Sequence, residues 1–381
     1  MNQRQGFLVF GNNWVQRFAT QLRFKSFYRF ISLFLIGIGL SVAIAACSGG
    51  STSPDTTGSA SPAADQKKEI EINLVSYAVP KTAHDAIIPL FQEKWQKAKG
   101  QTVTFTQSYG GSGSQTRAII DGLEADVVHL ALGADVEKLV EAKMINEDWN
   151  KTLPNNGIVA KSVAAVITRE GNPKNIKTFG DLTRDGVKWV TANPQTSGGA
   201  RWNFLVLWDY ALKNGGDEAK AAEFVTQAFK NVAILAKDAR EATDIFAKQG
   251  QGDALINYEN EVILAKQKGQ KIDYVVPEIN ISIDTPAAVV DRNVDKRGTR
   301  EVAEAFTEFL FTPAAQAEFV KLGFRPVGDY AQTNAKELAT QFPQVKKLAT
   351  VDEYGGWGKV QKQFFADEAL FDQIQSKLGK S

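Results

Sequence analysis

Runs of glycine and small hydroxyl residues lie directly before predicted helices at two places in this sequence. The first is QSYGGSGSQTRAII, residues 107–120, and the second is NPQTSGGARWN, residues 193–203. A third predicted helix begins after Asp238, in the run ILAKDAREATDIFAKQG. The first N–H groups of a helix have no partner inside it, and glycine brings them close to a ligand because it lacks a Cβ. These residue types can therefore hold a small oxyanion with uncharged donors.

The first run does not match a nucleotide-binding loop. It has neither the Lys-Ser/Thr ending of a P-loop nor the GxGxxG spacing of a dinucleotide loop. Taken alone, a glycine loop that faces solvent explains this run as well as a ligand site does. The recurrence of the pattern favours a site, because helix N-termini converge at the carboxyl ends of strands in open α/β sheets.

A pocket built only from hydrogen-bond donors favours an anion that arrives without a proton. Enclosing a small dianion removes its hydration shell, which N–H groups and helix dipoles can replace. Each charge-assisted hydrogen bond contributes about 1.5–3 kcal/mol, so several are needed. The sequence shows no nucleophile–base pair, metal cluster or pair of catalytic acids with a supporting spacing, and it has only two His and one Cys. We therefore predict no catalytic residue, no metal site, no cofactor and no enzymatic activity.

The charge distribution argues against a nucleic-acid partner. Residues 1–46 contain five of the 44 basic residues and none of the 43 acidic residues, so the rest of the chain is slightly acidic. The 381 residues suffice for two or three domains, and an apolar content of 43% is typical of a globular protein.

Residues 1–46 have the layout of a secretory signal peptide. A basic stretch precedes an apolar run over residues 30–46, and the run ends in IAAC, which resembles a bacterial lipobox. We predict cleavage before Cys47, lipidation of that residue, and a periplasmic location with a lipid anchor in the membrane. The Ser-, Thr-, Gly- and Pro-containing residues 47–67 are predicted to form a flexible tether. The alternative is a permanent membrane helix in which Cys47 is incidental.

From Ile70 on, short apolar runs alternate with stretches of helical spacing, which predicts an α/β fold with mostly parallel sheets. Two runs, residues 157–173 and 277–293, resemble crossovers between two lobes. Two lobes joined by two strands can close on a ligand as a hinge does. The predicted units are lobe 1, residues 68–159 plus 284–345; lobe 2, residues 160–283; and a C-terminal helical segment, residues 346–381, that packs on the lobes.

The two histidines are expected to have structural roles. His84 is predicted to lie on an exposed face of the first helix. His129, in the apolar run VVHLAL, is predicted to be a packed strand residue.

Several segments resemble the sulfate-binding proteins of bacterial ABC importers. They are SYGGSG, NPQTSGGARWN, FKNVAILAKDAR, GDALINYENEVIL and YGGWGKVQKQFF. The similarity runs from about Ile72 to Gln373. It implies the two-lobed type II periplasmic-binding-protein fold and high-affinity binding of a sulfate ion between the lobes. It also implies a monomer that delivers sulfate to a membrane permease with ATPase subunits.

The resemblance implies a set of sulfate-binding residues that donate through backbone N–H groups or uncharged side chains. They are Ala78, Ser112, Ser197, Gly198, Gly199, Ala239 and Tyr258. Arg240 resembles a residue that supports the binding loops without touching the anion. Two positions depart from the family. Ala78 stands where Asp is usual, although only its N–H is needed, and Tyr258 stands where a Trp donates its indole N–H. A phenol can donate, but it can also accept.

Other ligands and one other function stay open at this point. Thiosulfate is a second candidate ligand, and molybdate and phosphate are weaker rivals. An extracytoplasmic hydrolase of sulfate or phosphate esters is the alternative from another class. Turnover of such esters would distinguish a hydrolase from a binding protein.

Overall fold

The computed structural model describes residues 69–379. The predicted signal peptide, the lipidation position Cys47 and the predicted tether, residues 47–67, lie outside the described residues. Within residues 69–379, no helix combines the length and the apolar character needed to cross a membrane.

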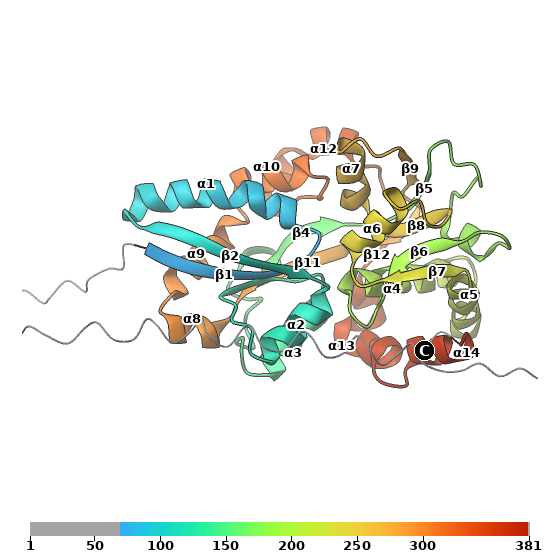
Figure 1. Cartoon of the computed structure of the whole chain (residues 1–381), viewed down its shortest axis with the longest axis horizontal. Coiled ribbons are helices and arrows are strands. Elements are labelled where there is room, and N and C mark those ends of the chain that lie inside the picture. The colour runs from blue at the N-terminus through green and yellow to red at the C-terminus, as the bar shows by residue number, and fades with distance from the viewer. Residues whose placement is uncertain (1–68, 380–381) are drawn as a thin grey trace, which may run out of the picture. The chain divides into compact units, whose positions relative to one another are not determined.

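Two five-stranded sheets form the framework of the fold (Figure 1). The first sheet has the order β2-β1-β3-β11-β4, with β1 (Glu69–Tyr77), β2 (Thr102–Gly110), β3 (Val127–His129), β4 (Ile158–Ser162) and β11 (Ile283–Val289). The second has the order β7-β6-β8-β5-β9, with β5 (Ala164–Arg169), β6 (Trp189–Ala192), β7 (Val232–Ala236), β8 (Ala254–Tyr258) and β9 (Ile272–Val275). A small sheet pairs β10 (Ile279–Ile281) with β12 (Lys347–Ala349).

Both large sheets are mixed, whereas the sequence predicts mostly parallel sheets. In the first, β1 runs parallel to β2 and β3, but β11 is antiparallel to β3 and β4. In the second, β6 runs parallel to β7 and β8, but β5 is antiparallel to β8 and β9. The antiparallel pairs involve the strands at which the chain changes sheets: β4 ends at Ser162 and β5 begins at Ala164. Such a direct passage does not use the helical crossover that makes successive strands parallel.

Helices connect most of the strands. In the first sheet, α1 (Lys81–Lys99), α2 (Ser112–Ile120) and α3 (Gly133–Glu141) follow β1, β2 and β3. In the second, α4 (Gly198–Lys213) and α5 (Glu218–Lys230) follow β6, while α6 (Ala239–Ala247) and α7 (Glu259–Gln267) follow β7 and β8. After β11 come α8 (Asp291–Arg297), α9 (Arg300–Phe309), α10 (Pro313–Lys321), α11 (Gly328–Thr333) and α12 (Ala335–Gln341).

The first helix buries a stripe that includes Ala83, Ile87, Phe91 and Trp95, at the spacing that predicted it. It ends at Lys99 and is followed by the C-cap residue Gly100, whose φ of 69° is left-handed. His84 lies on the same buried face and is fully buried, so its predicted exposure is wrong. Its ring finds polar partners inside the protein, which hydropathy spacing cannot reveal. The predicted packing of His129 in a strand is confirmed.

The C-terminal segment contains α13 (Gly356–Val360), a π-helical turn over Gln361–Phe365 and α14 (Leu370–Lys377). Its phenylalanines surround Phe204 of α4, with ring centroids 5.6 Å away for Phe364, 5.2 Å for Phe365 and 6.1 Å for Phe371. This segment therefore completes the core around α4, the helix that follows the second glycine run.

Candidate functional site

The anion-binding residues predicted from the sequence all line one cavity. It is narrow: the gaps between its lining atoms, including space open to solvent, amount to about 170 Å³, and the centre of a water-sized sphere does not fit inside. The other lining residues are Tyr77, Val79, Gly110, Gly111, Ala131 and Asp238. Arg240, which was expected to support the loops from behind, is not among the lining residues.

Both large sheets contribute to this cavity. Ala78 follows β1 and Ser112 follows β2, so these residues come from the first sheet. Ser197, Ala239 and Tyr258 stand at or just beyond the ends of β6, β7 and β8 in the second sheet. Every contribution thus comes from the carboxyl end of a strand, where helix N-termini converge.

Three of the predicted donors begin helices. Ser112 is the first residue of α2, Gly198 of α4 and Ala239 of α6. The N–H group of a first helical residue has no acceptor within its own helix, so a group outside the helix must satisfy it. Together with the positive ends of the helix dipoles, these N–H groups favour a negative ligand here.

The glycines allow the loops of the two sheets to approach closely. A Cβ on Gly199 would lie 2.7 Å from the Tyr258 hydroxyl oxygen, and one on Gly198 would lie 2.8 Å from the Cβ of Ala131. A Cβ on Gly111 would lie 2.4 Å from the carbonyl oxygen of Thr196. None of these glycines has a positive φ. Their role is therefore to remove a side chain rather than to permit an unusual backbone conformation.

The hydroxyl of Ser112 is oriented by a neighbouring strand. The backbone N–H of Ala131, just beyond β3, donates to Ser112 Oγ over 3.0 Å. Because Oγ is already an acceptor in this bond, its own O–H proton is available for donation into the cavity. Ser197 is the N-cap residue of α4 and makes no side-chain capping hydrogen bond. Its hydroxyl is therefore not used by the helix that it precedes.

Asp238 is the one carboxylate among the lining residues. It is the N-cap residue of α6, and its Oδ1 accepts a hydrogen bond of 2.9 Å from the N–H of Glu241. The charge of Asp238 thus caps α6, as the sequence predicts.

Arg240 is neutralised by a buried carboxylate. Its Nε and Nη2 donate to Glu261, with the shortest contact 2.7 Å from Nη2 to Oε1, and Nη2 also donates to the carbonyl of Val79 over 2.8 Å. Burial raises the pKa of the Glu261 carboxyl, and the Arg240 guanidinium opposes that increase. Arg240 therefore links α6 and α7 of the second sheet to the β1–α1 loop of the first. Its positive charge is paired with Glu261.

The Glu-Asn-Glu run after Tyr258 is fully engaged in supporting contacts. Glu259 pairs with Arg325 through contacts of 2.7 and 3.1 Å, and Asn260 Oδ1 accepts from Ser162 Oγ over 2.9 Å. Glu261 pairs with Arg240. These contacts fix the start of α7 and, through it, the backbone of Tyr258.

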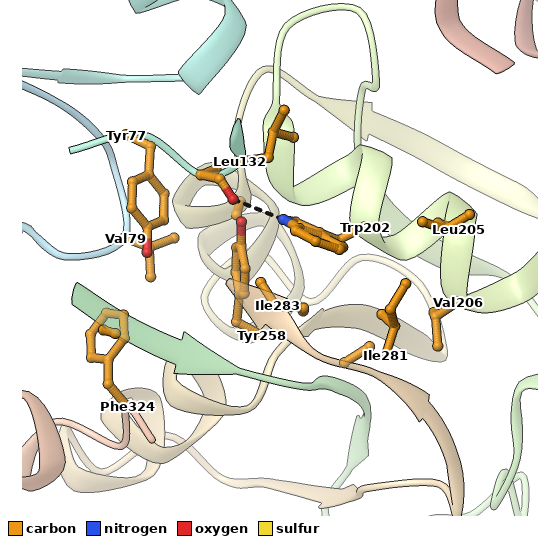
Figure 2. Packing of buried hydrophobic residues seen from close by; sticks show 14 of the residues in the cluster. Tyr77, Val79, Leu132, Trp202, Leu205, Val206, Tyr258, Ile281, Ile283 and Phe324 are labelled. Atoms are coloured by element: carbon orange, nitrogen blue, oxygen red, sulfur yellow. Dashed lines mark hydrogen bonds between the residues drawn. The ribbon is translucent and has the colours of Figure 1, made fainter. Parts of the chain in front are cut away.

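Tyr258 is 1% exposed, and its ring lies against Gly199. Figure 2 shows its side chain beside Trp202, with the hydroxyl directed toward the chain at Leu132. Within the described part of the chain, this buried hydroxyl has no hydrogen-bond partner. Burial raises the pKa of the phenol well above its usual value, so it stays protonated and can donate.

A family comparison agrees with this geometry. A family described as bacterial extracellular solute-binding proteins matches residues 72–325, which is more than half of the chain. The chain belongs to this family.

Relatives within the curated proteins are similar over most of their length. A sulfate-binding protein from Synechococcus elongatus is 53% identical, covering 88% of this chain and 93% of the relative. A sulfate-binding protein from Escherichia coli is 40% identical (81% and 94%), and a thiosulfate-binding protein from Pseudomonas aeruginosa is 39% identical (79% and 91%). The predicted resemblance to sulfate-binding proteins is thus confirmed.

Solved structures confirm the predicted fold. A sulfate-binding protein from Mycobacterium tuberculosis superposes with a TM-score of 0.71 at 37% identity, covering 78% of this chain and 99% of the other. A periplasmic thiamin-binding protein shares the fold with a TM-score of 0.61 at 14% identity. This solute-binding protein has the type II periplasmic-binding-protein fold.

Several contacts that join the two sheets of this solute-binding protein are not predictable from local sequence patterns. Arg201 Nη1 lies 3.0 Å from Asp135 Oδ1 in a buried ion pair between α4 and α3. The N–H of Ser114 donates to the carbonyl of Thr196 over 3.3 Å. Arg201 lies within the second glycine run, two residues after Gly199, but nothing in the local pattern identifies its distant partner. No cluster of three or more potential metal ligands is found within residues 69–379.

Proposed function

We propose that this protein binds sulfate in the cavity between its two sheets and delivers it to an ABC-type membrane importer. The observation that carries this proposal is the convergence of uncharged donors from both sheets on one cavity. The names of its relatives, which are sulfate-binding and thiosulfate-binding proteins, support the same ligand class. Sulfate is held by hydrogen bonds and helix dipoles, and no covalent step is involved.

Binding and lobe closure are one process in this proposal. The two lobes, residues 68–159 plus 284–345 and residues 160–283, hinge at the passages near Val163 and Ser282. Ala78 and Ser112 approach the anion from one lobe, while Ser197, Gly198, Gly199, Ala239 and Tyr258 approach it from the other. A ligand that contacts both lobes binds the closed form more tightly than the open form, and so shifts the population toward closure. The importer recognises the closed form.

Selectivity follows from the chemistry of the donors. Phosphate carries at least one proton at pH 7, and that proton needs an acceptor in the cavity. Asp238 Oδ1 already accepts the N–H of Glu241, and the residues proposed to bind the anion present N–H or O–H donors. The phosphate proton therefore has an acceptor only if Asp238 Oδ2 or the Tyr258 hydroxyl reaches it, and without one it stays unpaired at a cost of about 1–3 kcal/mol. Sulfate has no proton to place.

Calorimetric titration at pH 7 with sulfate, thiosulfate, molybdate and phosphate tests this function. Sulfate is expected to bind at least tenfold more tightly than phosphate, since about 1.4 kcal/mol corresponds to tenfold. Equal affinities for sulfate and phosphate would contradict a pocket of donors alone. Thiosulfate is the second candidate ligand, because thiosulfate-binding proteins are among the relatives. Turnover of sulfate or phosphate esters would favour the hydrolase alternative.

We also propose that the mature protein is a monomer and begins at a lipidated Cys47, which anchors it outside the cytoplasmic membrane. The single Cys of the chain stands at the end of the apolar run over residues 30–46. Mass spectrometry of protein purified from bacterial membranes tests the anchor. A mature N-terminus at Cys47 that carries acyl chains is expected, and an intact N-terminus or an unmodified Cys47 would refute it.

A further inference from the structure

A continuous set of hydrogen bonds runs from the cavity to the opposite side of the cleft. Ser112 Oγ accepts from the N–H of Ala131 over 3.0 Å. The carbonyl of the same residue accepts from the indole Nε1–H of Trp202 over 2.8 Å, the bond drawn as a dashed line in Figure 2. The N–H of Ala131 thus binds Ser112, a predicted anion donor, and its carbonyl binds Trp202 of α4.

This bond connects the two sheets. Ala131 follows β3 of the first sheet, whereas Trp202 lies in α4, which follows β6 of the second. Trp202 stands one helical turn after Gly198 and Gly199, the predicted backbone donors. The Trp202 indole therefore moves with Gly198 and Gly199, which lie on the same helix. It also binds Ala131, whose N–H orients the Ser112 hydroxyl in the other lobe.

The indole is held in place by its surroundings. Trp202 is fully buried, and its ring meets Trp357 of α13 edge to face with the centroids 4.5 Å apart. The ring of Trp357 also lies against the backbone of α3, because a Cβ on Gly133 would lie 3.4 Å from its Cδ1. The Trp202 donor is thus presented to Ala131 in a fixed direction.

We propose that Trp202 is a positioning residue that couples anion binding to lobe closure. Its indole N–H satisfies the Ala131 carbonyl only when the lobes are closed, and closure places the α4 N-terminus and the Ser112 hydroxyl on the same anion. In the open form, water can satisfy this carbonyl. Without the indole, closure would bury the carbonyl unpaired, so the loss falls on the closed form. This inference rests on the proposed function as an anion-binding protein.

Trp202→Phe removes the indole donor and keeps an aromatic ring in the core. Trp189→Phe is a matched control, because Trp189 Nε1 donates to the carbonyl of Ala228 over the same 2.8 Å. Trp189 is also fully buried and meets Phe229 edge to face at 5.6 Å. Its bond joins β6 to α5, so it lies on the side of the second sheet alone.

Sulfate affinity is measured by calorimetry, the dissociation rate by stopped flow, and closure by small-angle X-ray scattering with and without sulfate. Trp202→Phe is expected to weaken sulfate binding about 5- to 30-fold, which corresponds to about 1–2 kcal/mol, mainly through faster dissociation. It should also reduce the sulfate-induced decrease in radius of gyration at subsaturating sulfate. Trp189→Phe should leave both quantities unchanged although it lowers the urea midpoint.

Equal sulfate affinity in wild type and Trp202→Phe would overturn the coupling, as would equal weakening in both variants. Failure of the wild type to bind sulfate would instead refute the proposed function, so the two failures are distinguishable. If Trp202→Phe does not fold, benzothienylalanine at position 202 keeps the bicyclic shape and removes only the N–H. Wild-type affinity in that protein would equally refute the proposal.

Discussion

The two walls of the cavity are supported by different kinds of buried polar group. Behind the wall from the first sheet, His84 Nε2 lies 3.0 Å from His129 Nδ1, His84 Nδ1 lies 3.0 Å from the Tyr109 hydroxyl, and His129 Nε2 lies 3.2 Å from Thr285 Oγ1. Burial, with a smaller contribution from the Lys81 charge, lowers the pKa of His84 to about 3. Burial, and secondly the charge that His84 carries when it is protonated, lower the pKa of His129 well below its usual value. This network is therefore neutral at pH 7.

Behind the wall from the second sheet, the supporting groups are charged and paired. Glu259 and Glu261 are both essentially buried, and they bind Arg325 and Arg240. The supporting groups described here are thus neutral in the first wall and charged but paired in the second. The Asp238 carboxylate, which lines the cavity, is held instead by the N–H of Glu241. Different changes should therefore destabilise the two walls. Removing one charge of an ion pair should destabilise the second wall, and lowering the pH should destabilise the first.

The largest expected effect is on the second wall. Glu261→Gln leaves the partly buried Arg240 guanidinium without its counter-charge, and breaking such a pair costs about 3–5 kcal/mol. Because the Arg240 side chain is 24% exposed, we expect the low end of this range. Urea unfolding without sulfate measures it. The control is Glu93→Gln, which removes an exposed i,i+4 partner of Lys97 and should leave stability unchanged. Equal effects in both variants would contradict the pairing argument.

The next largest effect is expected at the contact between Gly199 and Tyr258, which both belong to the second wall. Gly199→Ala introduces a Cβ 2.7 Å from the Tyr258 hydroxyl oxygen, so the loop or the ring must move and the donors lose their alignment. We expect sulfate binding weaker by at least about 2 kcal/mol, comparable to the cost of overpacking. Gly358→Ala in α13 is the control, since a Cβ there meets nothing within 4 Å. Unchanged sulfate affinity in Gly199→Ala, measured by calorimetry, would show that the cavity is wider than this.

Tyr258→Phe tests the donor of the second wall that departs from the family. It keeps the ring and removes only the buried hydroxyl, so sulfate binding should weaken by about 1–3 kcal/mol, as expected when a charged acceptor loses a partner. Phosphate discrimination should increase if the hydroxyl accepts its proton. Tyr258→Trp should restore sulfate binding if the larger ring fits. Identical affinity in wild type and Tyr258→Phe would make Tyr258 only a wall of the cavity.

Ser112→Ala is the corresponding test on the first wall. It removes the hydroxyl that Ala131 orients, with an expected loss of about 1–2 kcal/mol in sulfate binding. Ser114→Ala serves as control, because Ser114 lies two residues further into α2 and does not line the cavity. If calorimetry ranks the two variants in the opposite order, the assignment of the donor in this loop is wrong.

The last effect concerns pH; it is smallest near neutrality and accumulates as the pH is lowered. The folded-state pKa of His84 lies below its usual value of 6.5, so the unfolded chain binds more protons between these values and stability falls as pH decreases from about 6.5 toward 3. The slope is at most about 1.4 kcal/mol per pH unit for each histidine. Urea unfolding between pH 7 and pH 4 measures it. His84→Gln keeps a polar side chain that does not titrate and should show a shallower slope. An unchanged slope would place the pH dependence elsewhere.

Local features of the cavity could be predicted from the sequence. Helices α2 and α4 begin within the two glycine runs, and α6 begins directly after Asp238. These starts are predictable because helix capping depends on neighbouring residues. The resemblance of several short segments added the ligand class and the residues to examine. The resemblance also implied the backbone donors, which stay a prediction; the structure places Gly198 and Ala239 at helix starts.

Only the tertiary structure decided which distant groups meet. His84 and His129 are 45 positions apart, Trp202 and Ala131 are 71 apart, and Arg240 and Glu261 join different helices. The reversal of strand direction where the chain changes sheets was equally hidden, because a strand's hydropathy does not record its direction. Such pairings depend on how sheets and helices pack, and a buried polar side chain is stable at an apolar position only where packing supplies its partner.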